Sequence, residues 1–164
     1  MTKRKQKFKR RLVRERVLQV LFAFEMNKDS LQLLINEILA DLHNNSDREF
    51  ANELINRVLE HVDEFDGMIK VRVANWEMNR IALIDKILLR MGICELLYFP
   101  DIPPKVSINE VIEIAKNYST AGSGKFINGI LDAILSETKK SGKLNKTGRG
   151  LIEESITKHP DKSS

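Results

Sequence analysis

The chain has 164 residues, which is enough to bury the core of one domain or of two small packed subdomains. Its 42% hydrophobic and 30% charged residues are typical of a soluble globular protein, and no apolar run approaches the roughly 18 residues that span a bilayer. The single cysteine, Cys94, excludes an internal disulfide and suits a reducing cytoplasm, where we expect the protein to be located.

Positive charge is concentrated at the start of the chain. Residues 1–16 contain nine Lys or Arg and one acid, Glu15, whereas the remaining residues contain 18 Lys or Arg and 22 Asp or Glu. This imbalance predicts a basic arm over residues 1–9 that binds a polyanion. Charge alone does not separate RNA from DNA or an anionic membrane, and a merely solubilising terminus is the alternative.

The first predicted helix follows the arm directly. One face of this helix is apolar: Val13, Val17, Val20, Leu21 and Phe24. At about 100° per residue, a basic flank borders that face: Lys7, Arg10, Arg11 and Arg14. Lys9 and Arg16 fall on the opposite flank. We expect the apolar face to dock on the protein and the arginine flank to stay outside as a ridge, which suits single-stranded RNA because guanidinium groups grip phosphates and stack on unpaired bases.

Two further helices precede the middle of the chain. Ser30 can cap the second, whose apolar residues run from Leu31 to Leu42 with helical spacing. Asp47 is the predicted cap of the third, and Gly67 is expected to bend or end that helix early.

The segment from Ile81 to Phe99 is apolar on nearly all sides, which predicts a central helix packed on several faces. Lys86 and Arg90 lie one turn apart and should mark its exposed edge. Two interpretations of this pair stay open, because it can bind RNA or be neutralised by Asp85 and Glu95.

The "FPDIPPK" stretch ends the central helix, since proline removes a backbone donor. Ser107 and Glu110 then have capping-box spacing at the start of the next helix. "GSGKF", residues 122–126, lacks the first glycine and the Ser or Thr of a phosphate-binding loop, so it predicts a tight helix–helix connection with Ser123 as the cap. A single phosphate at the amides of that helix start is still allowed.

The overall prediction is an all-α bundle of about six or seven helices over residues 10–136, followed by a flexible polar tail over residues 137–164. The histidines stand alone on different segments, and Cys94 has no histidine near it in sequence, so it is best explained as a small buried hydrophobe. We therefore expect no catalytic residue, metal or cofactor.

Three blocks resemble the NusB family of bacterial transcription antitermination factors: "RRLVRERVLQVLF", "IDKILLRMGICELLYFPDIPPKVSINEVIEIAKNYS" and "GKFINGILDAIL". The resemblance implies two small helical subdomains that share a long central helix, no enzyme activity, and no membrane association. It implies binding of boxA RNA together with NusE, a small-subunit ribosomal protein, within an RNA polymerase antitermination complex that acts notably on ribosomal RNA operons.

The resemblance also implies roles for individual residues. It places the family's arginine-rich motif on Arg10, Arg11 and Arg14, favours RNA contact by Lys86 and Arg90, and associates Phe22 and Asp85 with the NusE-facing side. The candidate RNA-binding set is Lys7, Arg10, Arg11, Arg14, Lys86, Arg90 and Lys125. The neutral "STAGSG" loop and the long extension past Ser136 depart from the family pattern.

The sequence also allows other interpretations. The chain can be a protein-interaction module with an incidental basic arm, or an RNA-binding domain of the kind fused to ribosomal RNA methyltransferases. An apolar helix face serves a core or a dimer seam equally well, so a homodimer is also allowed.

Overall fold

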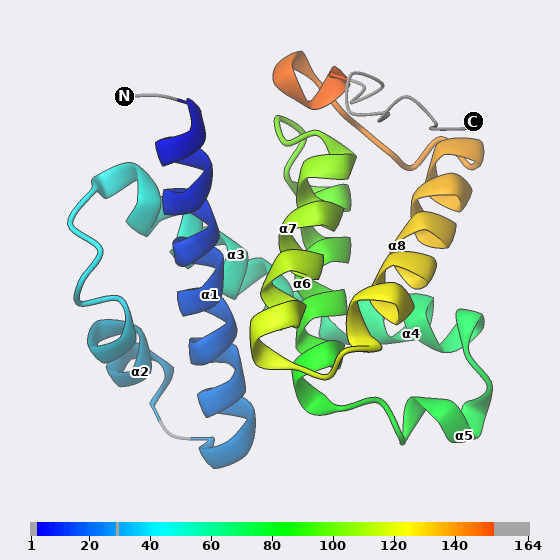
Figure 1. Cartoon of the computed structure of the whole chain (residues 1–164), viewed down its shortest axis with the longest axis horizontal. Helices are drawn as coiled ribbons and strands as arrows, with labels where there is room; N and C mark the ends of the chain where they lie inside the picture. The colour runs from blue at the N-terminus through cyan, green and yellow to red at the C-terminus, as the bar shows by residue number, and fades with distance from the viewer. Residues whose placement is uncertain (1–2, 29, 153–164) are drawn as a thin grey trace, which may run out of the picture.

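The computed structural model describes residues 3–28 and 30–152, apart from the side chains of residues 3–8, 75 and 76. That part of the chain forms eight α-helices and one short 3-10 helix, with no strand (Figure 1). The helices are α1 Lys3–Asn27, α2 Leu31–Ile38, α3 Asn45–Glu60, α4 Val62–Arg72, α5 Asn75–Met78, α6 Leu83–Tyr98, α7 Pro104–Tyr118, α8 Ser123–Lys140 and η1 Gly148–Leu151. The predicted all-α class is confirmed.

Two helix boundaries in the first half differ from the prediction. Ser30 caps α2 as expected, with its side chain accepting from the Leu33 amide. The cap of α3 is Asn44 and not Asp47, because the Asn44 side chain accepts from the Asp47 amide at 3.2 Å. The predicted third helix is divided at His61, whereas Gly67 lies within α4.

The predicted capping box on α7 is wrong. The helix begins four residues earlier, with Pro103 as the cap and Pro104 as the first helical residue, where a missing backbone N–H costs no hydrogen bond. Ser107 and Glu110 are consequently inside the helix, and both are buried. Ser123 is the first residue of α8 and makes no capping hydrogen bond.

Helix α6 occupies the centre of the molecule. Helices α1, α2 and α3 lie on one side of it, and α4, α7 and α8 lie on the other (Figure 1). Contacts of α6 with α1, α3, α4, α7 and α8 join the two groups. The expectation of two helical subdomains that share a central helix is therefore confirmed.

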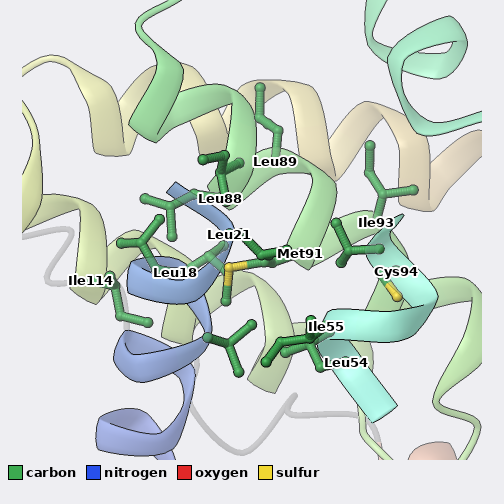
Figure 2. Packing of buried hydrophobic residues seen from close by; sticks show 14 of the residues in the cluster. Leu18, Leu21, Leu54, Ile55, Leu88, Leu89, Met91, Ile93, Cys94 and Ile114 are labelled. Carbon is green, nitrogen blue, oxygen red and sulfur yellow. The ribbon is translucent and has the colours of Figure 1, made fainter. Parts of the chain in front are cut away.

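The apolar core explains this arrangement. Eleven of the sixteen residues of α6 are buried. Figure 2 shows Met91 of α6 between two groups of side chains that are at most 4% exposed: Leu18 and Leu21 of α1, and Leu54 and Ile55 of α3. Because burying one such side chain contributes about 1.5–3 kcal/mol, the core outweighs any single polar contact.

The chain after Ser136 is not an unstructured tail as far as Ile152. Helix α8 continues to Lys140, and Gly142 then adopts a left-handed conformation with φ 74° that reverses the chain. Residues 143–152, here called the C-terminal strap, return to the end of α6. Residues 153–164, the rest of the predicted tail, lie outside the described residues.

Candidate nucleic-acid interface

The directions of α1, α6 and α7 determine which candidate residues lie at the same end of the molecule. Arg11 contacts Glu110 and Gln19 contacts Tyr118, so α1 and α7 run parallel. Helix α6 runs antiparallel to both, since the short Phe99–Pro103 connection reverses the chain between α6 and α7. The N-terminal turns of α1 therefore lie beside the C-terminal end of α6, and we call this end of the molecule the arm end (Figure 1).

Arg14 does not belong to an exposed ridge, so that prediction is wrong. Its side chain is only 3% exposed. It forms a bidentate ion pair with Glu95 of α6, in which Nε donates to Oε2 at 2.9 Å and Nη2 donates to Oε1 at 2.7 Å. Ser107 Oγ also donates to Glu95, at 2.9 Å. Burial alone would lower the pKa of Arg14, but the charge and hydrogen bonds of Glu95 outweigh it and raise that pKa.

Arg11 is also held inside the fold. Its guanidinium donates to both carboxylate oxygens of Glu110 on α7, at 2.8 and 3.1 Å, and its side chain is 20% exposed. Hydrogen bonding to Glu110 raises the pKa of Arg11. Arg11 and Arg14 thus fasten α1 to α7 and α6, which is a structural role that the ridge interpretation did not include.

Lys9 and Arg10 keep the most accessible charges among the described side chains of the arm end of α1. Their side chains are 46% and 35% exposed, and both lie near Asp47 of α3, at 3.8 and 3.7 Å. The Arg10 guanidinium also lies over the ring of Phe50, 4.4 Å from its centroid. RNA contact by Arg10 stays a prediction that this position supports. The side chain of Lys7 lies outside the described residues.

The predicted exposed edge on α6 is wrong, because neither of its two cations is fully exposed. Arg90 is 8% exposed and donates to both oxygens of Asp66 on α4, at 2.7 and 2.8 Å, so its expected exposure is wrong. Lys86 is half-buried and has no ion pair within the described part of the chain. Neither Asp85 nor Glu95 neutralises Arg90, since each has other partners.

Asp85 joins α6 to the α7–α8 turn. Its two oxygens accept from Ser119 Oγ at 2.6 Å and from Ser123 Oγ at 2.8 Å, and the residue is 7% exposed. It lines an open hollow together with Arg80 and Phe126. Contact of Asp85 with a partner stays a prediction, as does that of Phe22, which is half-buried and packs against the core.

The candidate cations do not form one continuous track. Lys125 is exposed near the start of α8, and Lys86 follows Asp85, which bonds to the turn before α8. Asp85 and Lys86 lie at the height of Gln19 on α1, because Gln19 contacts Tyr118 and Asp85 contacts Ser119. Arg10 is about ten residues of helix away from that height, or roughly 15 Å. The expected alignment of the α1 arginines beside Lys86 and Arg90 is therefore wrong.

The two acids that hold the arm end have other roles in the sequence prediction, Glu95 as a partner of the α6 cations and Glu110 as part of a capping box. Glu95 and Glu110 are 0% and 1% exposed, and each is bound by an arginine of α1. The one available signal was Glu95 itself, because a carboxylate inside so apolar a helix requires a buried partner.

Several sequence predictions concern chemistry other than RNA binding. Cys94 is fully buried, as expected, and burial raises the pKa of its thiol. Across residues 3–28 and 30–152, no group of three or more His, Cys, Asp or Glu side chains is arranged to hold a metal ion. Over the same ranges, none of the helices combines the length and the apolar character that a membrane crossing requires.

Comparison with known proteins identifies the family. The model of the NusB family matches residues 11–136. The chain is 48% identical to transcription antitermination protein NusB of Salinibacter ruber over 145 residues, which cover 87% of this chain and 91% of that protein. Among solved structures, T. maritima NusB has a TM-score of 0.73 at 38% identity, covering 82% of this chain and 97% of its own. A crystal structure of antitermination factors NusB and NusE in complex with dsRNA has the same fold, with a TM-score of 0.71 at 23% identity, covering 83% of this chain and 99% of its own. This chain belongs to the NusB family.

Proposed function

We propose that this chain is a transcription antitermination factor of the bacterial cytoplasm. It binds boxA-type single-stranded RNA together with a NusE-type ribosomal protein and promotes read-through by RNA polymerase, notably on ribosomal RNA operons. Membership of the NusB family carries the proposal, because the Salinibacter relative bears the name transcription antitermination protein. The solved complex that contains NusE and dsRNA supports the two partners for its own NusB.

The geometry of the arm end supports RNA as the ligand. Lys9 and Arg10 present partly exposed charge on a helix that two buried or part-buried ion pairs hold in place. A fixed helix has less conformational freedom to lose on binding than a mobile arm, which favours affinity. The Arg10 guanidinium, which rests on the buried Phe50 ring, offers a phosphate contact and a planar group on which a base can stack.

The test is a binding titration with fluorescent boxA RNA and a scrambled RNA of equal length, across a salt series, with and without purified NusE. If about four to six phosphates are neutralised, the slope of log affinity against log salt should be near −3 to −4. Binding that prefers boxA and tightens with NusE is expected. Weak binding that is equal for both RNAs and indifferent to NusE would overturn the proposed function and leave only the fold.

A further inference from the structure

A second basic segment lies near the other end of the chain. Residues 138–152 contain five Lys or Arg and no acid, whereas residues 17–137 contain 11 Lys or Arg and 19 Asp or Glu. Both basic segments come to the same end of the molecule: η1 of the strap and the first turns of α1 lie at the top of Figure 1. Both segments with an excess of positive charge therefore lie at one end of the molecule, whereas the region between them in the sequence is acidic.

The C-terminal strap is fastened there by specific contacts. Lys146 Nζ donates to the backbone carbonyls of Glu95 and Phe99, at 3.0 and 2.8 Å, and so satisfies acceptors at the C-terminal end of α6. The Thr147 amide donates to the Pro100 carbonyl at 2.9 Å. Gly150 packs so closely on the same carbonyl that a Cβ would lie 1.9 Å from its oxygen. These contacts fix where the other strap side chains are placed.

A short path of contacts connects the strap to α1. The guanidinium of Arg10 covers the ring of Phe50, and that ring meets Phe99 edge-on at 5.6 Å between centroids. The carbonyl of Phe99 is one of the two that Lys146 binds. Glu95 and Asp101 act electrostatically on both Arg10 and Lys146. The strap and the partly exposed cations of α1 therefore lie at the same end of the molecule, joined through the buried pair of Phe50 and Phe99.

Lys143 and Arg149 carry the available charge of this strap. Both are exposed, and neither side chain has an acidic partner within the part of the chain that the structure describes. Lys9 and Arg10, in contrast, share Asp47. We propose that the C-terminal strap forms the second half of the RNA-binding surface, with Lys143 and Arg149 contacting phosphates of the same RNA that Lys9 and Arg10 bind.

This inference rests on the proposed function and adds to it a site beyond residues 11–136, the part that the family model matches. An acidic protein surface is the competing ligand for two exposed cations. RNA is favoured because the strap lies at the same end of the molecule as the partly exposed cations of α1, Lys9 and Arg10. The regularly spaced phosphates of one RNA strand can contact cations that come from two separate segments of the chain.

The experiment compares three full-length proteins: the unaltered chain, Lys143→Ala/Arg149→Ala, and a matched control, Lys28→Ala/Lys70→Ala. The control removes the same charge from exposed lysines, one of them at the opposite end of α1. Affinity for fluorescent boxA RNA is measured across a salt series. Thermal unfolding midpoints of all three should agree closely, since every replaced side chain is solvent-exposed or pairs only at the surface.

Losing two phosphate contacts should make the log–log salt slope shallower by about 1.4 for a single strand. If the proteins bind equally at 1 M salt, that change predicts about 25-fold weaker binding at 0.1 M salt for the strap variant and little change for the control. Equal loss in both variants, or no loss in either while the unaltered chain binds RNA, overturns the strap site but leaves the proposed function standing. Failure of the unaltered chain to bind RNA overturns both. If only the NusE-dependent gain in affinity is lost, the strap binds the protein partner and the RNA assignment is wrong.

Discussion

Replacing Arg14 by alanine should destabilise the protein severely, although it removes a residue of the arginine-rich motif. Glu95 would keep only the hydrogen bond from Ser107 and would remain fully buried. Removing one partner of a buried ion pair costs about 3–5 kcal/mol, because the other charge stays without compensation. The two lost charge-assisted hydrogen bonds, at 2.7 and 2.9 Å, give a similar figure at roughly 1.5–3 kcal/mol each.

Urea unfolding followed by circular dichroism measures this loss as a change in the free energy of unfolding, with the m-value checked for constancy. Arg16→Ala is the matched control, because Arg16 is on the same helix as Arg14 but pairs with Asp41 at the surface. That exposed ion pair should contribute little to the free energy of unfolding. The reasoning is refuted if Arg14→Ala loses no more stability than Arg16→Ala.

A double-mutant cycle separates the ion pair from ordinary packing. Arg14→Ala and Glu95→Ala are measured singly and together, and the buried pair predicts that the double variant is markedly more stable than the sum of the single losses implies. Additive losses would mean that Arg14 acts through its packing and not through Glu95.

Three further predictions concern other contacts. Arg90→Ala should lower the free energy of unfolding by about 2–3 kcal/mol in urea, less than Arg14→Ala, because Asp66 loses two charge-assisted hydrogen bonds but is 28% exposed and can regain water; an unchanged midpoint would contradict the ion pair. Gly150→Ala should cost about 1–3 kcal/mol, since its Cβ would collide with the Pro100 carbonyl, and a full-stability variant would contradict that close approach. Burial lowers the pKa of Lys146 from 10.5 to about 8, and titration of its side-chain NMR signal should show that midpoint. Because the unfolded chain then binds more protons between these two values, this residue should make stability rise with pH across that window, and a midpoint near 10.5 would contradict its buried position.

The helices of the core could be predicted because their signal is local. The spacing of Val13, Val17 and Val20 indicates one buried face of α1, and the all-round apolarity of Ile81–Phe99 predicts the central position of α6. Helix boundaries were harder to predict. The stretch "HNNSD" offers several capping side chains, and the backbone geometry decides which of them caps α3.

The fate of each arginine could not be predicted from periodicity alone. Arg14 lies next to the apolar face of α1, so whether it is covered depends on Glu95, which is 81 residues away in sequence. Arg90 likewise depends on Asp66. Charge composition predicts a basic end correctly, but it does not distinguish a cation that holds helices together from one that faces a ligand. The predicted set therefore includes arginines that hold helices together, Arg11, Arg14 and Arg90, beside cations whose RNA contact stays a prediction.

The division of the arm into structural and binding cations is tested most directly by one variant. Lys9→Ala/Arg10→Ala removes partly exposed charge and leaves the ion pairs of Arg11 and Arg14 intact. Affinity for boxA RNA is measured at 0.1 M salt against the unaltered chain and Lys28→Ala/Lys70→Ala, at a temperature where all three are folded. The account predicts about 25-fold weaker binding for Lys9→Ala/Arg10→Ala and little change for the control, from two lost phosphate contacts and equal binding at 1 M salt. Unchanged affinity in a folded Lys9→Ala/Arg10→Ala protein would contradict it.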